Sequence, residues 1–132
     1  MVKQIIIDTN FILICVKQKI QMFEELEELF GIYELVVGRQ VLNELNKLKT
    51  EKELKIKERE SAAVALKLLK NKKIKIVELN SPGADTGIVF YAAKKQDIIV
   101  ATLDRELKNR IVKENKKAKF LTIRQKKRIV IA

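Results

Sequence analysis

Apolar and polar residues along this chain alternate in blocks whose period changes from one block to the next. Short apolar runs with few turn residues are typical of strands buried on both faces of a sheet, and they predict strands at 2–7, 33–37, 74–79, 98–101, 120–123 and 129–131. Between these runs the apolar residues recur every three or four positions, which predicts helices at 9–18, 21–30, 39–49, 56–69, 84–95 and 105–114. Strands that alternate with helices favour a mainly parallel sheet between helices, so we expect an α/β fold.

Turn residues are scarce in this sequence. The chain has four glycines and one proline, and the clearest turn signal is Ser81-Pro82-Gly83. No repeat and no Gly/Ser linker divides the 132 residues, and the 47% hydrophobic content is enough for one core. We therefore expect residues 1–132 to form a single domain.

The residue types that are absent exclude several kinds of chemistry. The chain has no histidine, which excludes imidazole acid–base catalysis, Ser-His triads and the usual zinc sites. Its single cysteine, Cys15, excludes a disulfide within the chain and suits a cytoplasmic protein. The longest purely apolar run, Phe11 to Val16, is far too short to span a membrane, and no signal peptide is expected.

Positive charge is concentrated towards the end of the chain. Of the net charge of +11, residues 105–132 contribute +9, from 11 Lys and Arg residues against Glu106 and Glu114. Such a basic segment (105–128) favours a polyanionic partner, nucleic acid before membrane, although a lysine-rich surface of the heat-adapted kind is the alternative. The candidate RNA-binding residues are Arg105, Lys108, Arg110, Lys113, Lys116, Lys117, Arg124, Lys126, Lys127 and Arg128.

Two acidic residues follow predicted strands directly. Asp8 comes after the isoleucines at 5–7, and Asp104 follows the strand at 98–101 in the phrase Thr102-Leu103-Asp104. Ligand crevices of parallel sheets lie outside the carboxyl ends of the strands, which is where both acids are expected. Each acid also precedes a predicted helix, so an N-cap is the alternative role for both.

Two further acids lie on predicted helices, beside or on the faces expected to be buried. Glu44 borders the apolar stripe of its helix, where it either points into a crevice or reaches out to solvent. Asp85 shares the line of Ile88 and Val89, which places it on the core side of the first helical turn. A cap does not require the core side, so this position favours a functional role for Asp85.

Together these acids predict a metal site. Carboxylates at the edge of a core are costly unless they are paired or bound to a cation. Mg²⁺ and Mn²⁺ prefer carboxylate and water oxygens, and one or two such ions can activate water for phosphodiester cleavage. Asn10 and Thr102 offer supporting oxygens. The sequence has no Gly-x-x-x-x-Gly-Lys loop, so nucleoside triphosphate hydrolysis is not expected.

The order of these motifs resembles the PIN-domain ribonucleases over essentially the whole chain. The matching segments are Asp8-Thr9-Asn10, Glu44 in Val-Leu-Asn-Glu-Leu, Asp85 at a helix start, and Thr102-Leu103-Asp104. The resemblance implies a three-layer α/β/α sandwich with a central, mainly parallel sheet and a Mg²⁺ or Mn²⁺ site. It implies as catalytic and metal-binding residues Asp8, Glu44, Asp85 and Asp104, with Asn10 and Thr102 in support.

Residues 100–108, followed by Arg110, look most like the PIN endonucleases of small-subunit ribosomal RNA processing and their archaeal relatives. That likeness implies a metal-dependent endoribonuclease acting on structured RNA, with ribosomal precursor RNA, ribosome-assembly proteins and a second copy as the expected partners. A VapC-type toxin ribonuclease and a non-catalytic RNA-binding assembly module are the alternatives. A response-regulator-like domain is disfavoured, because Asp8 stands alone at its strand end.

Overall fold

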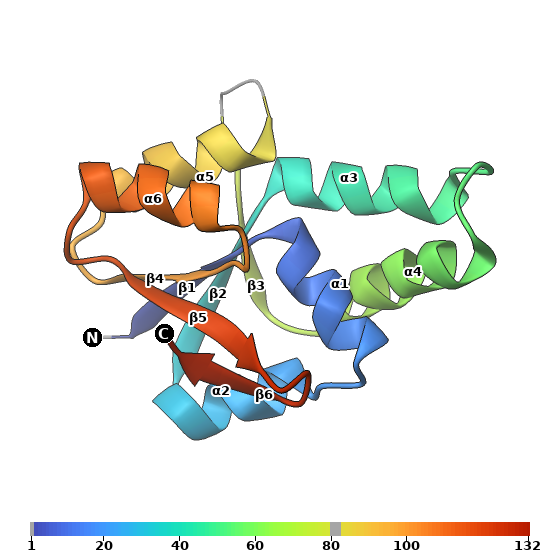
Figure 1. The fold of residues 1–132 in the computed structure, drawn as a ribbon, viewed down its shortest axis with the longest axis horizontal. Helices are drawn as coiled ribbons and strands as arrows, with labels where there is room; N and C mark the ends of the chain where they lie inside the picture. The colour runs from blue at the N-terminus through green and yellow to red at the C-terminus, as the bar shows by residue number, and fades with distance from the viewer. Residues whose placement is uncertain (1, 80–82) are drawn as a thin grey trace.

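The structure is a computed structural model that describes residues 2–79 and 83–132. Strands and helices alternate through most of the chain (Figure 1). In order, the elements are β1 (Lys3–Ile7), α1 (Thr9–Lys17), α2 (Met22–Phe30), β2 (Tyr33–Gly38), α3 (Arg39–Thr50), α4 (Ile56–Lys70), β3 (Ile74–Val77), α5 (Ala84–Ala93), β4 (Ile98–Ala101), α6 (Arg105–Glu114), β5 (Lys119–Arg124) and β6 (Arg128–Ile131).

The strands form one six-stranded sheet in the order β3-β2-β1-β4-β5-β6. The first five strands are parallel, and β6 returns antiparallel to β5. The chain moves from β1 outward through β2 to β3, and then crosses to the other side of β1 to form β4. Parallel sheets bind ligands where the direction of winding reverses in this way, so the carboxyl ends of β1 and β4 mark the expected crevice.

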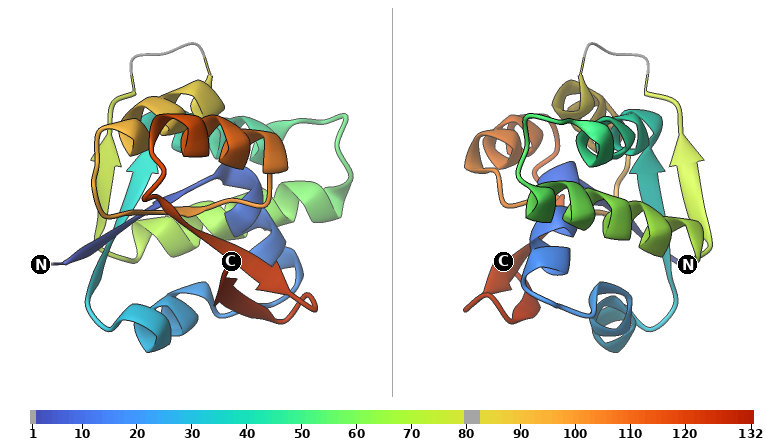
Figure 2. Two further views of the ribbon diagram at one scale, coloured as in Figure 1. Left: turned by 60° about the vertical axis from the view of Figure 1, so that its left-hand side comes forward. Right: turned by 90° about the vertical axis from the view of Figure 1, so that its right-hand side faces the viewer.

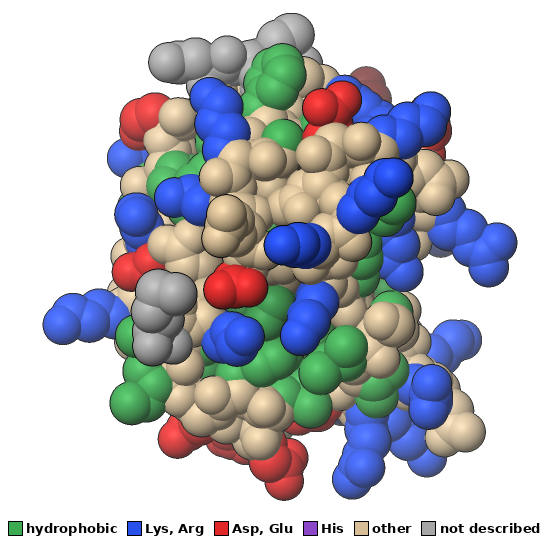
Figure 3. All heavy atoms as spheres, turned by 90° about the vertical axis from the view of Figure 1, so that its left-hand side faces the viewer, with side chains coloured by type: hydrophobic (Ala, Val, Ile, Leu, Met, Phe, Trp, Pro, Cys, Tyr) green, Lys and Arg blue, Asp and Glu red, His purple; other side chains and the backbone are tan. Residues whose placement is uncertain are grey.

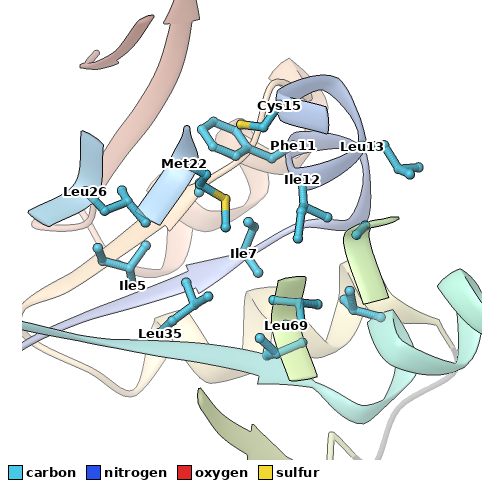
Figure 4. Close-up of a cluster of buried hydrophobic side chains, with 14 of the residues drawn as sticks. Ile5, Ile7, Phe11, Ile12, Leu13, Cys15, Met22, Leu26, Leu35 and Leu69 are labelled. Carbon is cyan, nitrogen blue, oxygen red and sulfur yellow. The ribbon is translucent and has the colours of Figure 1, made fainter. Parts of the chain in front are cut away.

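Hydrophobic side chains cover both faces of the sheet. On one face, strand residues such as Ile5, Ile7 and Leu35 pack against α1, α2, α3 and α4, and the close-up of this cluster shows Phe11 and Ile12 of α1 turned onto the strands (Figure 4). On the other face, residues that include Ile6 and Val100 pack against α5 and α6. Helices therefore enclose the sheet from both sides, as two further views show (Figure 2). The expected α/β/α sandwich with a mainly parallel sheet is confirmed.

The elements predicted from hydrophobic periodicity are all present, with small differences at their ends. β3 ends at Val77 instead of residue 79, and α5 ends at Ala93 instead of residue 95. Most of the expected turn at Ser81-Pro82-Gly83 lies outside the described residues, which resume at Gly83. Within the described residues, no helix has both the length and the apolar composition needed to cross a membrane.

A tight hairpin joins β5 to β6 and packs against α2. Of the three residues between the strands, Gln125 and Lys126 have positive φ, 54° and 56°, a left-handed backbone at which Asn and Gly are the usual residues. The carboxylate of Glu25 in α2 accepts a hydrogen bond from the backbone N–H of Ile129 in β6, at 2.7 Å. α2 therefore covers one edge of the sheet.

Candidate active site

The site begins at the carboxyl ends of the two central strands, where Asp8 and Thr102 meet. β1 and β4 pair in register to their last residues, Ile7 with Ala101, and the backbone N–H of Asp8 donates to the carbonyl of Ala101 at 3.0 Å. The hydroxyl of Thr102 donates to Oδ2 of Asp8 at 2.9 Å. Asp8 is 6% exposed and Thr102 is fully buried. The fold thus joins two polar residues 94 positions apart at the point where the winding of the sheet reverses.

The Asp8 side chain does not cap the helix that it precedes. The backbone carbonyl of Asp8 accepts from the N–H groups of Phe11 and Ile12, while its carboxylate makes no capping hydrogen bond. Burial raises the pKa of Asp8 from 3.8 to about 6, the Thr102 hydrogen bond opposes that rise, and the negative charges of Asp85 and Glu44 add to it. Capping therefore does not explain this buried acid, whose pKa is raised in part by two of the other candidate acids.

Asp104 does cap its helix, and it is also tied to Thr102. Its Oδ1 accepts from the backbone N–H groups of Glu106 and Leu107, at 2.9 and 3.2 Å, at the start of α6. Its own N–H donates to the hydroxyl oxygen of Thr102 at 3.1 Å. The Thr102 hydroxyl therefore links Asp8 to the backbone of Asp104. The N-cap role that the sequence left open is real for Asp104, and it uses one of the two carboxylate oxygens.

Glu44 and Asp85 approach the site from two different helices. Glu44 lies on α3, which follows β2, and it is half-buried beside the buried Val41 and Leu45, as its position next to the apolar stripe predicted. Asp85 lies in the first turn of α5 and is exposed, so the expectation that it faces the core is wrong. It precedes the first buried turn of α5, and a helical wheel shows the direction of a side chain but not its depth.

Asn10, the remaining predicted site residue, and the neighbouring Thr9 and Thr86 complete the surroundings. Asn10 is exposed in the first turn of α1, while the hydroxyl of Thr9 is buried without a hydrogen-bond partner. Thr86, beside Asp85, accepts a hydrogen bond from Nη2 of Arg110 at 3.3 Å, which ties the first turn of α5 to α6. Sequence analysis did not single out Thr86, and the one feature of the sequence that could have indicated a role for it was its position next to Asp85.

The donor set suits a hard divalent cation. Carboxylate and hydroxyl oxygens are the ligands that Mg²⁺ and Mn²⁺ prefer, and a buried carboxylate in the field of two others is stabilised by a nearby positive charge. Among the described residues, no group of three or more acidic or sulfur side chains is close enough to enclose one ion. Asp85 and Glu44 are therefore near enough to raise the pKa of Asp8. The described acids nevertheless do not form a closed cage around one point.

The basic residues fall on two separate surfaces. α6 starts at the capped Asp104, so Arg105 and its following cations begin beside the site. The hairpin cations from Arg124 to Arg128 lie next to α2, and Lys127 and Arg128 line a groove with Glu25 and Glu28. Figure 3 shows Lys and Arg side chains spread over one face of the molecule, with acidic side chains gathered along the lower edge, where α2 lies in Figure 1. The cations of the basic segment thus lie on α6 and on the hairpin, and those of the hairpin lie beside acidic residues of α2.

This fold and this group of acids define a family. The model of the PIN-like domain family matches residues 5–126, and the chain belongs to that family, within the PIN-domain ribonuclease superfamily.

Two relatives show how far the likeness extends. The chain is 36% identical over 125 residues to Ribonuclease VapC4 of Methanocaldococcus jannaschii, which covers 94% of this chain and 92% of that protein. Its fold is similar to the solved structure of the PIN domain endonuclease Utp24, with a TM-score of 0.78 and 28% sequence identity over 97% of this chain and 90% of that one. Both relatives are nucleases by name, and each match spans nearly the whole chain.

Proposed function

We propose that this protein is a metal-dependent endoribonuclease that hydrolyses phosphodiester bonds in structured RNA. The observation that carries the proposal is the buried Asp8 carboxylate, which lies at the reversal point of the sheet, accepts a hydrogen bond from Thr102 and feels the charges of Asp85 and Glu44. Membership of the PIN-domain superfamily and the oxygen-rich donor set support binding of Mg²⁺ or Mn²⁺ beside Asp8.

Each site residue has a distinct role in the proposed reaction. Asp8, Glu44, Asp85 and Asp104 are the residues that would hold a metal ion, and a bound ion would supply a water of lowered pKa and positive charge beside the phosphate. Thr102 orients Asp8 through its 2.9 Å hydrogen bond. Because Oδ1 of Asp104 caps α6, its second carboxylate oxygen is the one that would remain for a metal ion. Asn10 supports the site from the first turn of α1.

RNA is the proposed substrate, and α6 is its proposed track. The basic helix begins at the capped Asp104, so phosphates that follow its surface lead to the acids. Phosphate contacts carry little sequence information, and RNA shape or a partner protein therefore provides the specificity. Likeness of residues 100–110 to ribosomal RNA processing endonucleases supports ribosomal precursor RNA as the substrate, ribosome-assembly proteins as partners and the cytoplasm as the compartment.

A VapC-type toxin ribonuclease is the second candidate function, favoured by the 36% identity to Ribonuclease VapC4. The two roles differ in their effect on a cell. A toxin arrests growth when it is expressed alone, and the arrest depends on Asp8. A processing enzyme leaves growth intact and trims a precursor at defined ends.

Incubation of the protein with ribosomal precursor RNA and Mn²⁺, followed by mapping of the cut ends, tests the proposed function. We expect defined internal cuts that disappear in EDTA and in Asp8→Asn, whereas the matched variant Asp97→Asn, altered at an exposed acid outside the site, cleaves normally. Cleavage that persists in Asp8→Asn or in EDTA contradicts the metal mechanism. RNA binding without any cleavage by the unaltered protein favours the non-catalytic assembly module instead.

A further inference from the structure

A groove of about 470 Å³ lies where α3, α4 and β3 meet. None of the four acids of the candidate active site lines it. Aliphatic side chains from all three elements form its floor, namely Leu42, Leu66, Leu69, Ile74 and Ile76. Ile76 is 41% exposed, which leaves a branched apolar side chain open to solvent in the middle of a surface strand. The proposed ribonuclease reaction does not use this groove.

The groove borders an open edge of the sheet. β3 is the first strand in the sheet order and, within the described residues, pairs only with β2. Both views of Figure 2 show β3 at the margin of the sheet, with α4 crossing beside it in the right-hand view. The opposite edge strand, β6, packs against α2. An uncovered edge strand offers backbone N–H and C=O groups to an extended chain, and such strand addition is a common way of binding peptides.

The rim of the groove is positively charged. Arg39, Lys70, Lys72 and Lys73 line it, and no acidic residue does. Arg39 is already paired with Glu78 at 3.0 Å, and the ammonium of Lys72 lies over the ring of Phe23 at 5.4 Å. Lys70 and Lys73 are exposed and make no ion pair with any other described residue. Two cations are therefore available to a negatively charged partner.

The lining favours an acidic polypeptide over nucleic acid. Single-stranded RNA binds through base stacking on aromatic rings, and no aromatic residue lines this groove. Branched aliphatic side chains beside an open strand instead match the alternate side chains of an extended peptide. We propose that the groove docks an acidic, extended protein segment that adds to β3. Its apolar side chains rest on Ile74 and Ile76, and its carboxylates meet Lys70 and Lys73.

A fluorescent synthetic peptide in which Glu and Val alternate is the probe, with binding measured by fluorescence anisotropy. We expect the charge reversal Lys70→Glu with Lys73→Glu to weaken binding about tenfold, because two charged contacts become repulsive. The matched pair Lys57→Glu with Lys67→Glu makes the same charge change at exposed positions of α4 that do not line the groove, and it should bind within about twofold of the unaltered protein.

Two further measurements separate strand addition from general charge attraction. Ile76→Asn keeps every charge and should still weaken binding, and hydrogen exchange should show slower exchange of the β3 amides in the complex. A peptide with Lys in place of Glu should not bind. The proposal is overturned if the unaltered protein does not bind the acidic peptide, if both charge-reversed pairs weaken it equally, or if β3 gains no protection. It is overturned equally if the variant Lys70→Glu with Lys73→Glu loses binding to oligouridylate but keeps binding to the peptide. None of these outcomes depends on ribonuclease activity.

Discussion

Asp8 is a buried carboxylate whose ionisation opposes folding. Its pKa is about 6 in the folded protein and 3.8 without the fold, so between these values the folded state retains a proton that the unfolded chain has lost. Stability from this group is therefore present at low pH and is lost as the pH rises through about 6. The proposed metal site would use the same negative charge, so the carboxylate that weakens the fold at neutral pH is the one that the proposed function requires.

Asp8→Asn should make the metal-free protein more stable at pH 8, by up to about 3 kcal/mol, because the substitution removes the buried charge and retains an oxygen for the Thr102 hydrogen bond. Urea unfolding in EDTA measures the change, and the gain should vanish near pH 3.5, where both forms are neutral. If Asp8→Asn is no more stable than the unaltered protein at pH 8, burial of the ionised Asp8 carboxylate does not destabilise the fold. Nuclease activity should be lost in the same variant.

Thr102 controls the charge of Asp8 as well as its position. Thr102→Val removes a hydrogen bond that lowers the pKa of Asp8, so that pKa should rise further. The acidic limb of the pH profile for cleavage should move to higher pH, and the protein should lose about 1–3 kcal/mol of stability because Asp8 Oδ2 and the Asp104 N–H lose their partner. Thr102→Ser restores the hydroxyl and should restore the profile. A stability loss without any shift of the pH profile would assign Thr102 a purely structural role.

At the scale of elements, α6 and the β5–β6 hairpin should make separable contributions to the proposed RNA binding. Replacing Arg105 and Lys113 of α6 with alanine should reduce the log–log salt slope of binding by about 1.4, or about 0.7 per lost contact to single-stranded RNA. Replacing Lys126, Lys127 and Arg128 should weaken binding similarly across RNA sequences but reduce the slope less per residue, because the acids of α2 lie beside the hairpin. Salt titrations followed by filter binding compare the two. Unchanged slopes in both variants would mean that the basic segment serves solubility alone.

Periodicity in the sequence predicted the elements well because the buried face of each strand or helix is made of apolar residues that recur a few positions apart. The runs at 5–7 and 98–101 are buried on both sides, and they became the two central strands. Asp8 and Asp104 could be placed near the ends of these strands because each follows one of the two apolar runs in the sequence. Local patterns carry no record of depth or of pairing between distant segments, so the exposure of Asp85 and the Thr86–Arg110 hydrogen bond were not predicted. The division of the basic segment into two surfaces depends on where the hairpin packs, which is a tertiary property.

For the whole molecule, a bound metal ion should act as a stabilising ligand. Binding to the folded state alone contributes about 2.7 kcal/mol at a metal concentration one hundredfold above Kd. In thermal unfolding, increasing Mn²⁺ should therefore raise the Tm by several degrees, and more at pH 8 than at pH 5, because the proposed site requires Asp8 in its ionised form. Asp8→Asn should show little rise, and Asp97→Asn should match the unaltered protein. A rise of equal size in all three proteins would indicate metal binding elsewhere.

The central position of β1 has a consequence for how this molecule is made. Asp8 leaves the ribosome 94 residues ahead of its hydrogen-bond partner Thr102, and β4 must insert beside β1 before the two meet. Contacts so distant in sequence form late, because a long loop must close first. A nascent chain that has already folded β1, β2 and β3 still lacks Thr102 and Asp104. An enzyme that cuts RNA would then stay inert during its own translation until synthesis has passed Thr102 and Asp104 and β4 has joined the sheet.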